Sequence, residues 1–218
     1  MRELAVSDLG RDAGYGEVLA LQERLHASRA AREIPDTLLL LEHRPVYTLG
    51  RGAAAAHVLY SEERLREAGI ERVPTTRGGD VTYHGPGQLV GYPILHLGDA
   101  GLRVLEYVTA LEETLIRAVA DFGIIAARDP RNRGVWVGNA KLAALGIRVA
   151  RQVAMHGFAL NVAPRLDDYR GIVACGLTDA GVTSLQRLLG EAPAMPDVKR
   201  SVVRAFREVF RYGRDATA

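Results

Sequence analysis

The residues best suited to chemistry in this chain are its single cysteine and one of its two lysines. Cys175 is the only cysteine among 218 residues, and Lys141 and Lys199 are the only lysines among 28 basic residues. A lone cysteine is often a small buried apolar residue, but the glycine after Cys175 and the nearby Asp179 favour a loop with an accessible thiol. The apolar neighbours of Lys141 favour a site that needs a compact, titratable ammonium. The alternative is a surface lysine at a strand edge.

The densest motif of the sequence runs from Arg77 to Pro93 and reads RGGDVTYHGPGQLVGYP. Its glycines allow another molecule to approach the backbone closely, although Gly78-Gly79 can also be a bulge and Gly85-Pro86-Gly87 a turn. The motif has neither the Gly-Lys-Ser/Thr ending of a phosphate-binding loop nor the spacing of a dinucleotide-binding fingerprint. A further candidate, His156, lies in an apolar segment and is more typical of a hydrogen-bonded core histidine than of a ligand.

The composition limits the class of protein. With 48% hydrophobic and 25% charged residues, the chain has the balance of a folded globular protein. One cysteine cannot form an intramolecular disulfide or a cysteine-based zinc site, so we expect a reducing, cytoplasmic compartment and no metal. The acidic residues near the start and the lack of an apolar run of about 18 residues argue against secretion and membrane spanning. A net charge of +2 does not call for a nucleic-acid partner.

The apolar periodicity changes repeatedly between helical and strand spacing, which predicts a mixed α/β domain with a substantial antiparallel sheet. Helices are predicted over residues 15–32, 103–122 and 197–210. Strands are predicted over residues 37–42, 72–76, 89–96, 134–138, 141–149 and 153–162. Gly138 and Asn139 predict a turn between two of these strands. We expect residues 1–213 to form one domain and residues 214–218 to be a frayed tail.

Taken together, four segments resemble the successive motifs of the lipoyl(octanoyl) transferase family. They are Arg77 to Pro93, Lys141 to Ile147, His156 to Val162 and Cys175-Gly176. The resemblance extends over about residues 37 to 180, and one departure is Ala174, where the family usually has proline. It implies the α/β fold of the biotin and lipoate protein ligase catalytic domains, a mixed sheet flanked by helices.

The resemblance also implies a reaction. Cys175 would accept an octanoyl group from octanoyl-acyl carrier protein as a thioester and pass it to a lysine of a lipoyl domain. The implied acceptors are the lipoyl domains of 2-oxoacid dehydrogenases and the glycine cleavage H protein, and the implied enzyme is a monomer that needs no ATP or metal. Lys141 would lower the pKa of the Cys175 thiol and act as acid and base, with His84 as a competing, assisting base.

By the same resemblance, a larger set of residues would line the acyl and thioester site: Arg77, Gly78, Gly79, Asp80, Val81, Thr82, Tyr83, His84, Ala144, Leu145, Gly146, Gly157, Phe158 and Ala159. Three alternatives remain open from the sequence. They are an ATP-dependent lipoate or biotin ligase, a thioesterase that pairs Cys175 with His84 or His156, and a non-catalytic protein that binds an acyl carrier or lipoyl domain.

Overall fold

The computed structural model describes residues 2–173 and 181–213. The helices of the described chain are α1 (Tyr15–Ala30), α2 (Glu62–Ala68), α3 (Leu97–Ala100), α4 (Val104–Ala120), α5 (Leu185–Leu189) and α6 (Met195–Val209). Two short 3-10 helices span Ala55–His57 and Leu166–Gly171. The strands are β1 (Leu4–Asp8), β2 (Asp36–Leu41), β3 (Val46–Leu49), β4 (Glu71–Pro74), β5 (Val81–His84), β6 (Gln88–Ile94), β7 (Ala127–Asp129), β8 (Asn132–Val137), β9 (Ala140–Ala150), β10 (Val153–Asn161) and β11 (Gly181–Val182).

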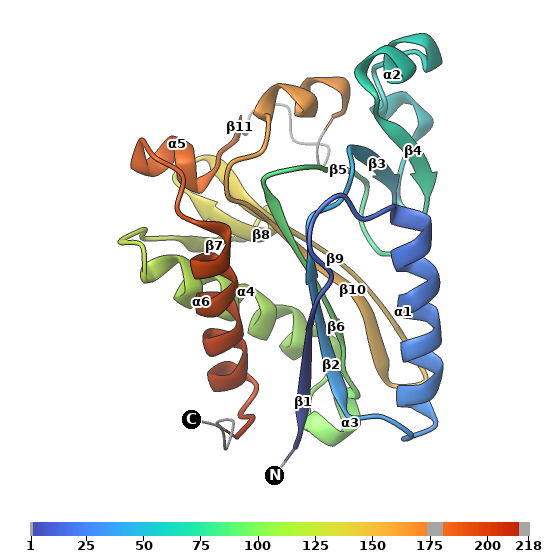
Figure 1. The fold of residues 1–218 in the computed structure, drawn as a ribbon, viewed down its shortest axis with the longest axis vertical. Helices are drawn as coiled ribbons and strands as arrows, with labels where there is room; N and C mark the ends of the chain where they lie inside the picture. Colours follow the sequence, from blue (N-terminus) through green and yellow to red (C-terminus); the bar gives the residue numbers. More distant parts are fainter. Residues whose placement is uncertain (1, 174–180, 214–218) are drawn as a thin grey trace.

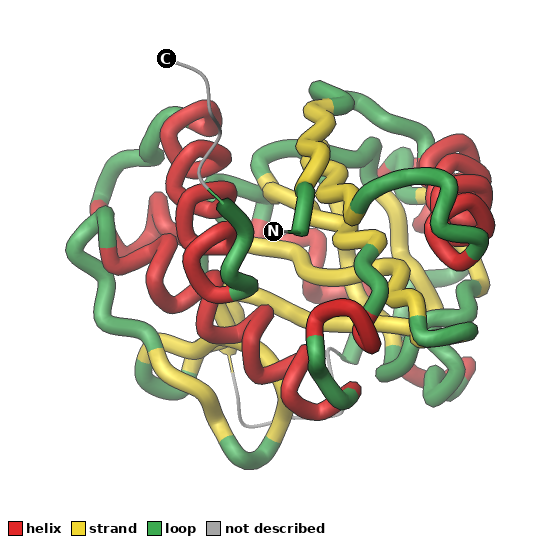
Figure 2. The backbone as a smooth tube through the Cα atoms, turned by 90° about the horizontal axis from the view of Figure 1, so that it is seen from below, coloured by secondary structure: helices red, strands yellow, loops and turns green. Residues whose placement is uncertain are grey.

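The main sheet is mixed and mostly antiparallel. Its strand order is β1-β2-β6-β10-β9-β8-β7, and β11 pairs with β9 outside this path. The β1–β2 and β11–β9 pairs are parallel, whereas β2, β6, β10, β9, β8 and β7 pair antiparallel in turn. Helix α1 covers one face of this sheet, and α4 and α6 lie against the other face (Figure 1). Seen from below, the sheet again lies between the helices of its two faces (Figure 2).

A smaller sheet has the order β4-β3-β5. Along the chain its strands come between β2 and β6, which are themselves neighbours in the main sheet. Its strand β5 ends at His84, and the chain turns at Gly85–Gly87, where Gln88 N donates to Gly85 O at 3.1 Å, before it enters β6. His84 is therefore placed at the junction of the two sheets. That position is set by the turn rather than by any helix.

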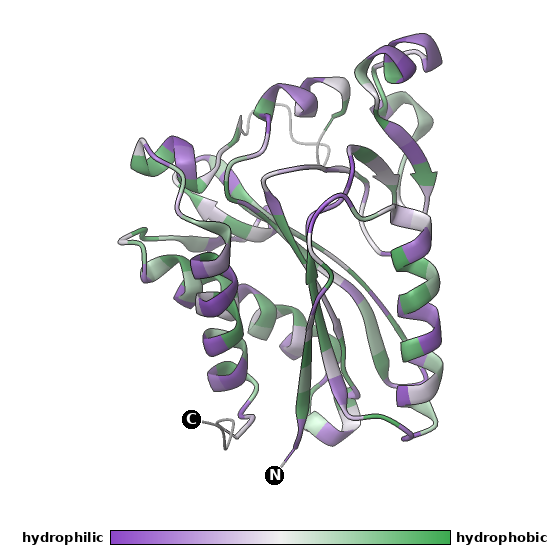
Figure 3. Cartoon of the chain, viewed as in Figure 1, coloured by the Kyte–Doolittle hydropathy of each residue, from purple (hydrophilic) through white to green (hydrophobic). Residues whose placement is uncertain are grey.

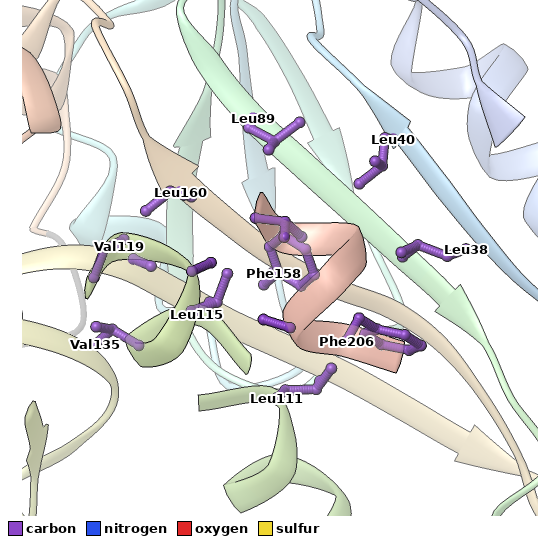
Figure 4. Close-up of a cluster of buried hydrophobic side chains, with 14 of the residues drawn as sticks. Leu38, Leu40, Leu89, Leu111, Leu115, Val119, Val135, Phe158, Leu160 and Phe206 are labelled. Atoms are coloured by element: carbon purple, nitrogen blue, oxygen red, sulfur yellow. The ribbon is translucent and has the colours of Figure 1, made fainter. Parts of the chain in front are cut away.

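Successive side chains along a strand point to opposite faces of the sheet, so the core residues of the central strands are divided between the two faces. Leu38 and Leu40 pack with residues of α4 and α6, while Leu39 and Leu41 pack with Val18 of α1. Figure 4 shows the first of these clusters, in which Phe158 and Leu160 of β10 point toward Leu111, Leu115 and Phe206. Because both faces are covered, β2 is buried along its whole length, and the central strands are predominantly hydrophobic in Figure 3.

The long elements match the sequence prediction, while several short ones were missed. The three predicted helices correspond to α1, α4 and α6, and the six predicted strands to β2, β4, β6, β8, β9 and β10. The predicted Gly138-Asn139 turn is confirmed between β8 and β9. Strands β1, β3, β5, β7 and β11 and helices α2, α3 and α5 were not predicted, because runs of two to seven residues seldom carry enough periodicity to identify an element.

Candidate active site

A cavity of about 110 Å³ lies on the α1 side of the main sheet, where the small sheet meets it. Strands β9 and β10 provide its floor, and the segment before β5 provides one wall. The lining residues are Tyr15, Arg77, Gly79, Asp80, Val81, Thr82, His84, Tyr92, Asn132, Ala144, Leu145, Gly146, His156, Gly157, Phe158 and Ala159. Of the predicted substrate-binding set, only Gly78 and Tyr83 do not line it.

These two exceptions support the wall instead. Gly78 N donates to Ile147 O at 2.8 Å, which fixes the segment before β5 against strand β9. The Tyr83 ring is buried, and its hydroxyl donates to Asp168 Oδ2 at 2.8 Å. Both residues therefore hold the cavity in shape without facing it.

Arg77 fixes the same segment to the small sheet. Arg77 is 6% exposed. Its Nε donates to Thr48 Oγ1 at 3.1 Å, and its Nη1 donates to Gly78 O at 3.0 Å. A Cβ atom on Gly146 would lie 3.0 Å from Arg77 Cδ. Glycine at position 146 thus allows the arginine to lie directly against β9.

The cavity wall on the side of α1 is made of the uncharged rings of Tyr15, His84 and Tyr92, and His43 contacts these rings without lining the cavity. His43 Nε2 lies 2.8 Å from the Tyr92 hydroxyl, and the rings of Tyr15 and His84 are stacked with centroids 6.3 Å apart. Burial lowers the pKa of His43 to about 4, and burial together with the charge of His43 lowers that of His84 to about 3. Burial raises the pKa of Tyr15 to about 12. At neutral pH these rings are uncharged, which suits an apolar ligand.

His156 also lines the cavity and differs from its predicted role as a fully hydrogen-bonded core histidine. The side chain is 1% exposed, and its Nδ1 has no hydrogen-bond partner among the described residues. Its Nε2 lies 3.4 Å from Thr76 Oγ1. Burial and the charge of Arg77 lower the pKa of His156 to about 4, so this imidazole is neutral as well.

Lys141 lies beside the cavity and is joined to it through Asn132. The Lys141 Nζ donates to Asn132 Oδ1 at 2.8 Å, and Asn132 lines the cavity. The same Nζ lies 4.9 Å from the centre of the Trp136 ring. With 7% of its surface exposed, Lys141 is not the surface lysine that was the alternative from the sequence. Its ammonium is held in a fixed place near the lining residues.

The predicted nucleophile Cys175 lies outside the described residues, but the chain is described on both sides of it. Before it, Val173 N donates to His57 O at 2.9 Å, and His57 Nδ1 lies 2.5 Å from Oδ2 of the cavity residue Asp80. After it, Val182 of β11 is in register with Lys141 of β9. The described ends of this segment are thus attached to the cavity wall and to the strand that carries Lys141.

Sequence reasoning did not assign a site role to three lining residues, Tyr15, Tyr92 and Asn132, and gave His156 one only in the thioesterase alternative. Tyr92 and His156 lie within motifs that were singled out, so their positions carried a signal. Tyr15 opens α1 and Asn132 opens β8, and nothing in the local pattern separates them from ordinary polar or aromatic residues.

Residues 2–173 and 181–213 contain neither a metal-binding cluster nor a membrane-spanning helix. No group of three or more histidine, cysteine, aspartate or glutamate side chains in these ranges is arranged to hold a metal ion. None of the helices in these ranges combines the length and apolar character needed to cross a membrane.

Comparison of the fold with solved structures identifies its class. Over 97% of this chain and 85% of the other, it is similar to a bi-partite lipoate protein ligase from Thermoplasma acidophilum, with a TM-score of 0.75 at 16% identity. It is also similar to the biotin protein ligase of Aquifex aeolicus, with a TM-score of 0.56 at 13% identity over 97% of this chain and 70% of that one. The predicted ligase-like fold is therefore confirmed.

Comparison of the sequence identifies the family. Residues 14–207 match the model of the lipoyl protein ligase A/B catalytic domain. The chain is 49% identical to an octanoyltransferase of Caldicellulosiruptor saccharolyticus over 90% of this chain and 84% of that one. It is 47% identical to an octanoyltransferase of Solibacter usitatus over 97% and 95%. The chain belongs to the octanoyltransferase family, within the lipoyl protein ligase A/B catalytic domains.

Proposed function

We propose that this octanoyltransferase takes its octanoyl group from octanoyl-acyl carrier protein and delivers it to the lysine of lipoyl domains. The acceptors would be the lipoyl domains of 2-oxoacid dehydrogenases and the glycine cleavage H protein. The observation that carries the proposal is the cavity itself. Its glycine-lined floor and uncharged rings suit an acyl chain, and Lys141 lies one hydrogen bond from its edge.

The acyl chain supplies the binding free energy. Burial of roughly seven methylene groups at about 0.8 kcal/mol each contributes on the order of 5 kcal/mol before the entropy lost on binding is subtracted. Neutral histidines at the wall avoid the penalty of burying a charge beside this chain. The cavity is therefore suited to select an octanoyl group over shorter acyl groups.

In the first half-reaction, Cys175 would be the nucleophile. Its thiolate attacks the carbonyl carbon of the carrier thioester, and the bond from that carbon to the pantetheine sulfur breaks. The Lys141 ammonium then gives a proton to the departing pantetheine thiolate. The exchange of one thioester for another is nearly isoenergetic and needs no ATP. An adjacent ammonium lowers the pKa of a thiol and increases its thiolate fraction at neutral pH.

In the second half-reaction, the lysine of the lipoyl domain attacks the Cys175 thioester. A free lysine with a pKa near 10.4 is almost entirely protonated at pH 7, so a base must accept its proton. The ammonium form of the substrate lysine first gives one proton to solvent, and the neutral amine attacks the thioester carbonyl. Lys141, neutral after the first step, takes the second proton from the attacking nitrogen, and the Cys175 thiolate leaves as the amide forms. His84 is the weaker candidate for this base because burial lowers its pKa to about 3.

The alternative of an ATP-dependent ligase is less well supported. The solved ligases share the fold with this chain at 13–16% identity, whereas its relatives at 47–49% identity are octanoyltransferases. A thioesterase would use the same thiol but would release the acyl group to water instead of to an amine.

One experiment tests the proposal against these alternatives. The protein is incubated with octanoyl-acyl carrier protein without ATP, and its intact mass is measured. We expect one added octanoyl group in the wild type, none in Cys175→Ser, and loss of the group when lipoyl domain is added. Absence of an adduct under turnover conditions would contradict the thioester mechanism. Release of free octanoate without modification of the lipoyl domain would indicate a thioesterase.

A further inference from the structure

A chain of buried side-chain amides connects His84 to the main chain beside Lys141. Gln88 of β6 is fully buried, and Asn161 of β10 is 3% exposed. Asn161 Nδ2 donates to Thr183 O at 3.0 Å, and Gln88 Nε2 donates to Asn161 Oδ1 at 2.9 Å. Gln88 Oε1 lies 2.7 Å from His84 Nδ1. At the other end, Thr183 N donates to Lys141 O at 3.0 Å.

Main-chain carbonyls fix the direction of each hydrogen bond between Thr183, Asn161, Gln88 and His84. Thr183 O can only accept, so Asn161 must turn its NH2 group toward it and its Oδ1 toward Gln88. The Gln88 NH2 group faces that oxygen and a second carbonyl, Tyr83 O, at 3.2 Å. Its Oε1 is therefore the atom that faces His84.

This direction determines which nitrogen of His84 carries the proton. An amide oxygen has no hydrogen to donate, so the hydrogen bond to Gln88 must come from a proton on His84 Nδ1. A neutral imidazole carries one such proton, which leaves a lone pair on Nε2. His84 lines the cavity, and its Nδ1 is already occupied by Gln88.

We infer that Gln88 and Asn161 are positioning residues that hold His84 in the Nδ1–H tautomer, with Nε2 as a hydrogen-bond acceptor for a substrate N–H group in the cavity. The inference rests on the proposed function, because it takes an acyl-transfer substrate to occupy this cavity. That N–H group belongs either to the incoming lysine or to an amide of the pantetheine arm. In this tautomer His84 cannot donate to the thioester carbonyl, so it does not stabilise the oxyanion.

The tautomer of His84 is measured directly on the resting protein by long-range ¹H–¹⁵N NMR of the imidazole rings. The signals of His84 are assigned by their loss in His84→Gln. We expect the pattern of a protonated Nδ1 in the wild type and a loss of that preference in Gln88→Met, which removes the acceptor at similar volume. A protonated Nε2 in the wild type would overturn the inference. Because this result comes from the wild-type spectrum alone, it tests the inference even if Gln88→Met does not fold.

Gln22→Met is the matched control. Gln22 is also a fully buried glutamine, and its Oε1 accepts from His156 N at 2.9 Å, so its loss removes a buried amide away from His84. We expect the His84 pattern to be unchanged in this variant. The same change in both variants would mean that any loss of a buried amide disturbs the site, which would contradict a specific role for Gln88.

Kinetics of the two half-reactions then identify the substrate N–H group. If this group belongs to the incoming lysine, Gln88→Met slows discharge of the acyl-enzyme about tenfold. If it belongs to the pantetheine amide, the same variant slows acylation by a similar factor. Unchanged rates in both half-reactions would overturn the role of His84 toward substrate. The tautomer is measured without substrate, so its result does not depend on acyl transfer. If Nδ1 of His84 is protonated but the enzyme transfers no acyl group, the proposed function is contradicted and the positioning of His84 by Gln88 and Asn161 is not.

Discussion

At the scale of single residues, the two lysines have different surroundings. Lys141 Nζ contacts an amide oxygen and an aromatic ring next to the cavity, whereas Lys199 Nζ pairs with Asp8 at 2.7 Å. Both residues carry the same charge on the same scaffold. The two lysines therefore allow a matched comparison, in which Lys141 is expected to influence the Cys175 thiol and Lys199 is not.

We predict that Lys141→Ala slows alkylation of the Cys175 thiol at pH 7 about tenfold, because the thiol pKa returns to near 8.5 and its thiolate fraction falls. The measurement is the rate of iodoacetamide modification as a function of pH, followed by mass. Lys199→Ala is the control and should alkylate at the wild-type rate. Equal rates in Lys141→Ala and the wild type would show that Lys141 does not activate the thiol.

Gly146 gives a second prediction at this scale. A Cβ atom at this position would lie 3.0 Å from Arg77 Cδ and 3.2 Å from Gly78 O, so Gly146→Ala forces the cavity wall to shift. Overpacking of this kind costs about 1–3 kcal/mol, and we expect roughly tenfold weaker binding of the octanoyl donor. Titration with octanoyl-acyl carrier protein measures this affinity in a Cys175→Ser background, which we expect to bind the donor without accepting its acyl group.

The control for this change is Gly16→Ala on α1. A Cβ atom at Gly16 has no neighbour within 4 Å among the described residues, and alanine is favoured over glycine within a helix by about 0.5–1 kcal/mol. This variant should bind the donor normally and be slightly more stable. If Gly146→Ala also bound the donor normally, the acyl group would not lie against this part of the wall.

At the scale of elements, one buried carboxylate connects four parts of the chain. Asp36 at the start of β2 is 2% exposed. It accepts from Arg29 Nε of α1 at 2.8 Å, from the main-chain N of His96 before α3 at 3.0 Å, and from the Tyr212 hydroxyl after α6 at 2.7 Å. The helices on both faces of the sheet are thus attached to a single side chain.

We predict that Asp36→Asn lowers the free energy of unfolding by about 3 kcal/mol, because Arg29 then lacks its buried charged partner and the amide NH2 group faces other donors. Urea denaturation measures the change. Asp197→Asn is the matched control, since Asp197 pairs with Arg200 on the exposed surface of α6, and its effect should stay within about 0.5 kcal/mol. Similar losses in the two variants would contradict a connecting role for Asp36.

At the scale of the whole molecule, three neutral histidines make folding depend on pH. Burial lowers the pKa values of His43, His84 and His156 to about 4, 3 and 4, from about 6.5 in an unfolded chain. Below pH 6.5 the unfolded chain binds protons that the folded chain does not. The stability that these groups provide is therefore complete above pH 6.5 and is lost as the pH falls toward 4.

We predict that the free energy of unfolding falls by about 3 kcal/mol between pH 6 and pH 5, since each histidine contributes up to about 1.4 kcal/mol per pH unit. These groups give only a small slope between pH 7 and pH 8, where they are largely uncharged in both states. His156→Gln should reduce the fall by about a third. Urea denaturation at each pH tests this, and a flat profile from pH 7 to pH 5 would mean that the histidines are not buried in neutral form.

Short segments mark the limit of what could be predicted about the fold. The apolar stripes of α1, α4 and α6 and the strands β6, β8, β9 and β10 were recognisable, because burial on a fixed face imposes a period on many residues. Strand β5 has four residues, and its pairing with β3 depends on a chain segment more than thirty residues away. No local pattern can encode such a pairing, although β5 carries His84 into the site.

The sequence by itself indicated the family, because four of its motifs resemble those of the octanoyltransferases, and one thiol and two lysines restrict which groups can act. Only the tertiary structure decided which residues meet at the cavity. Asn132 lines the cavity and accepts a hydrogen bond from Lys141, and Gln88 and Asn161 orient His84. These contacts join residues on different strands, and their hydrogen bonds depend on strand order and register. Residue types can be identified from the sequence, but their distances and proton positions are properties of the folded chain.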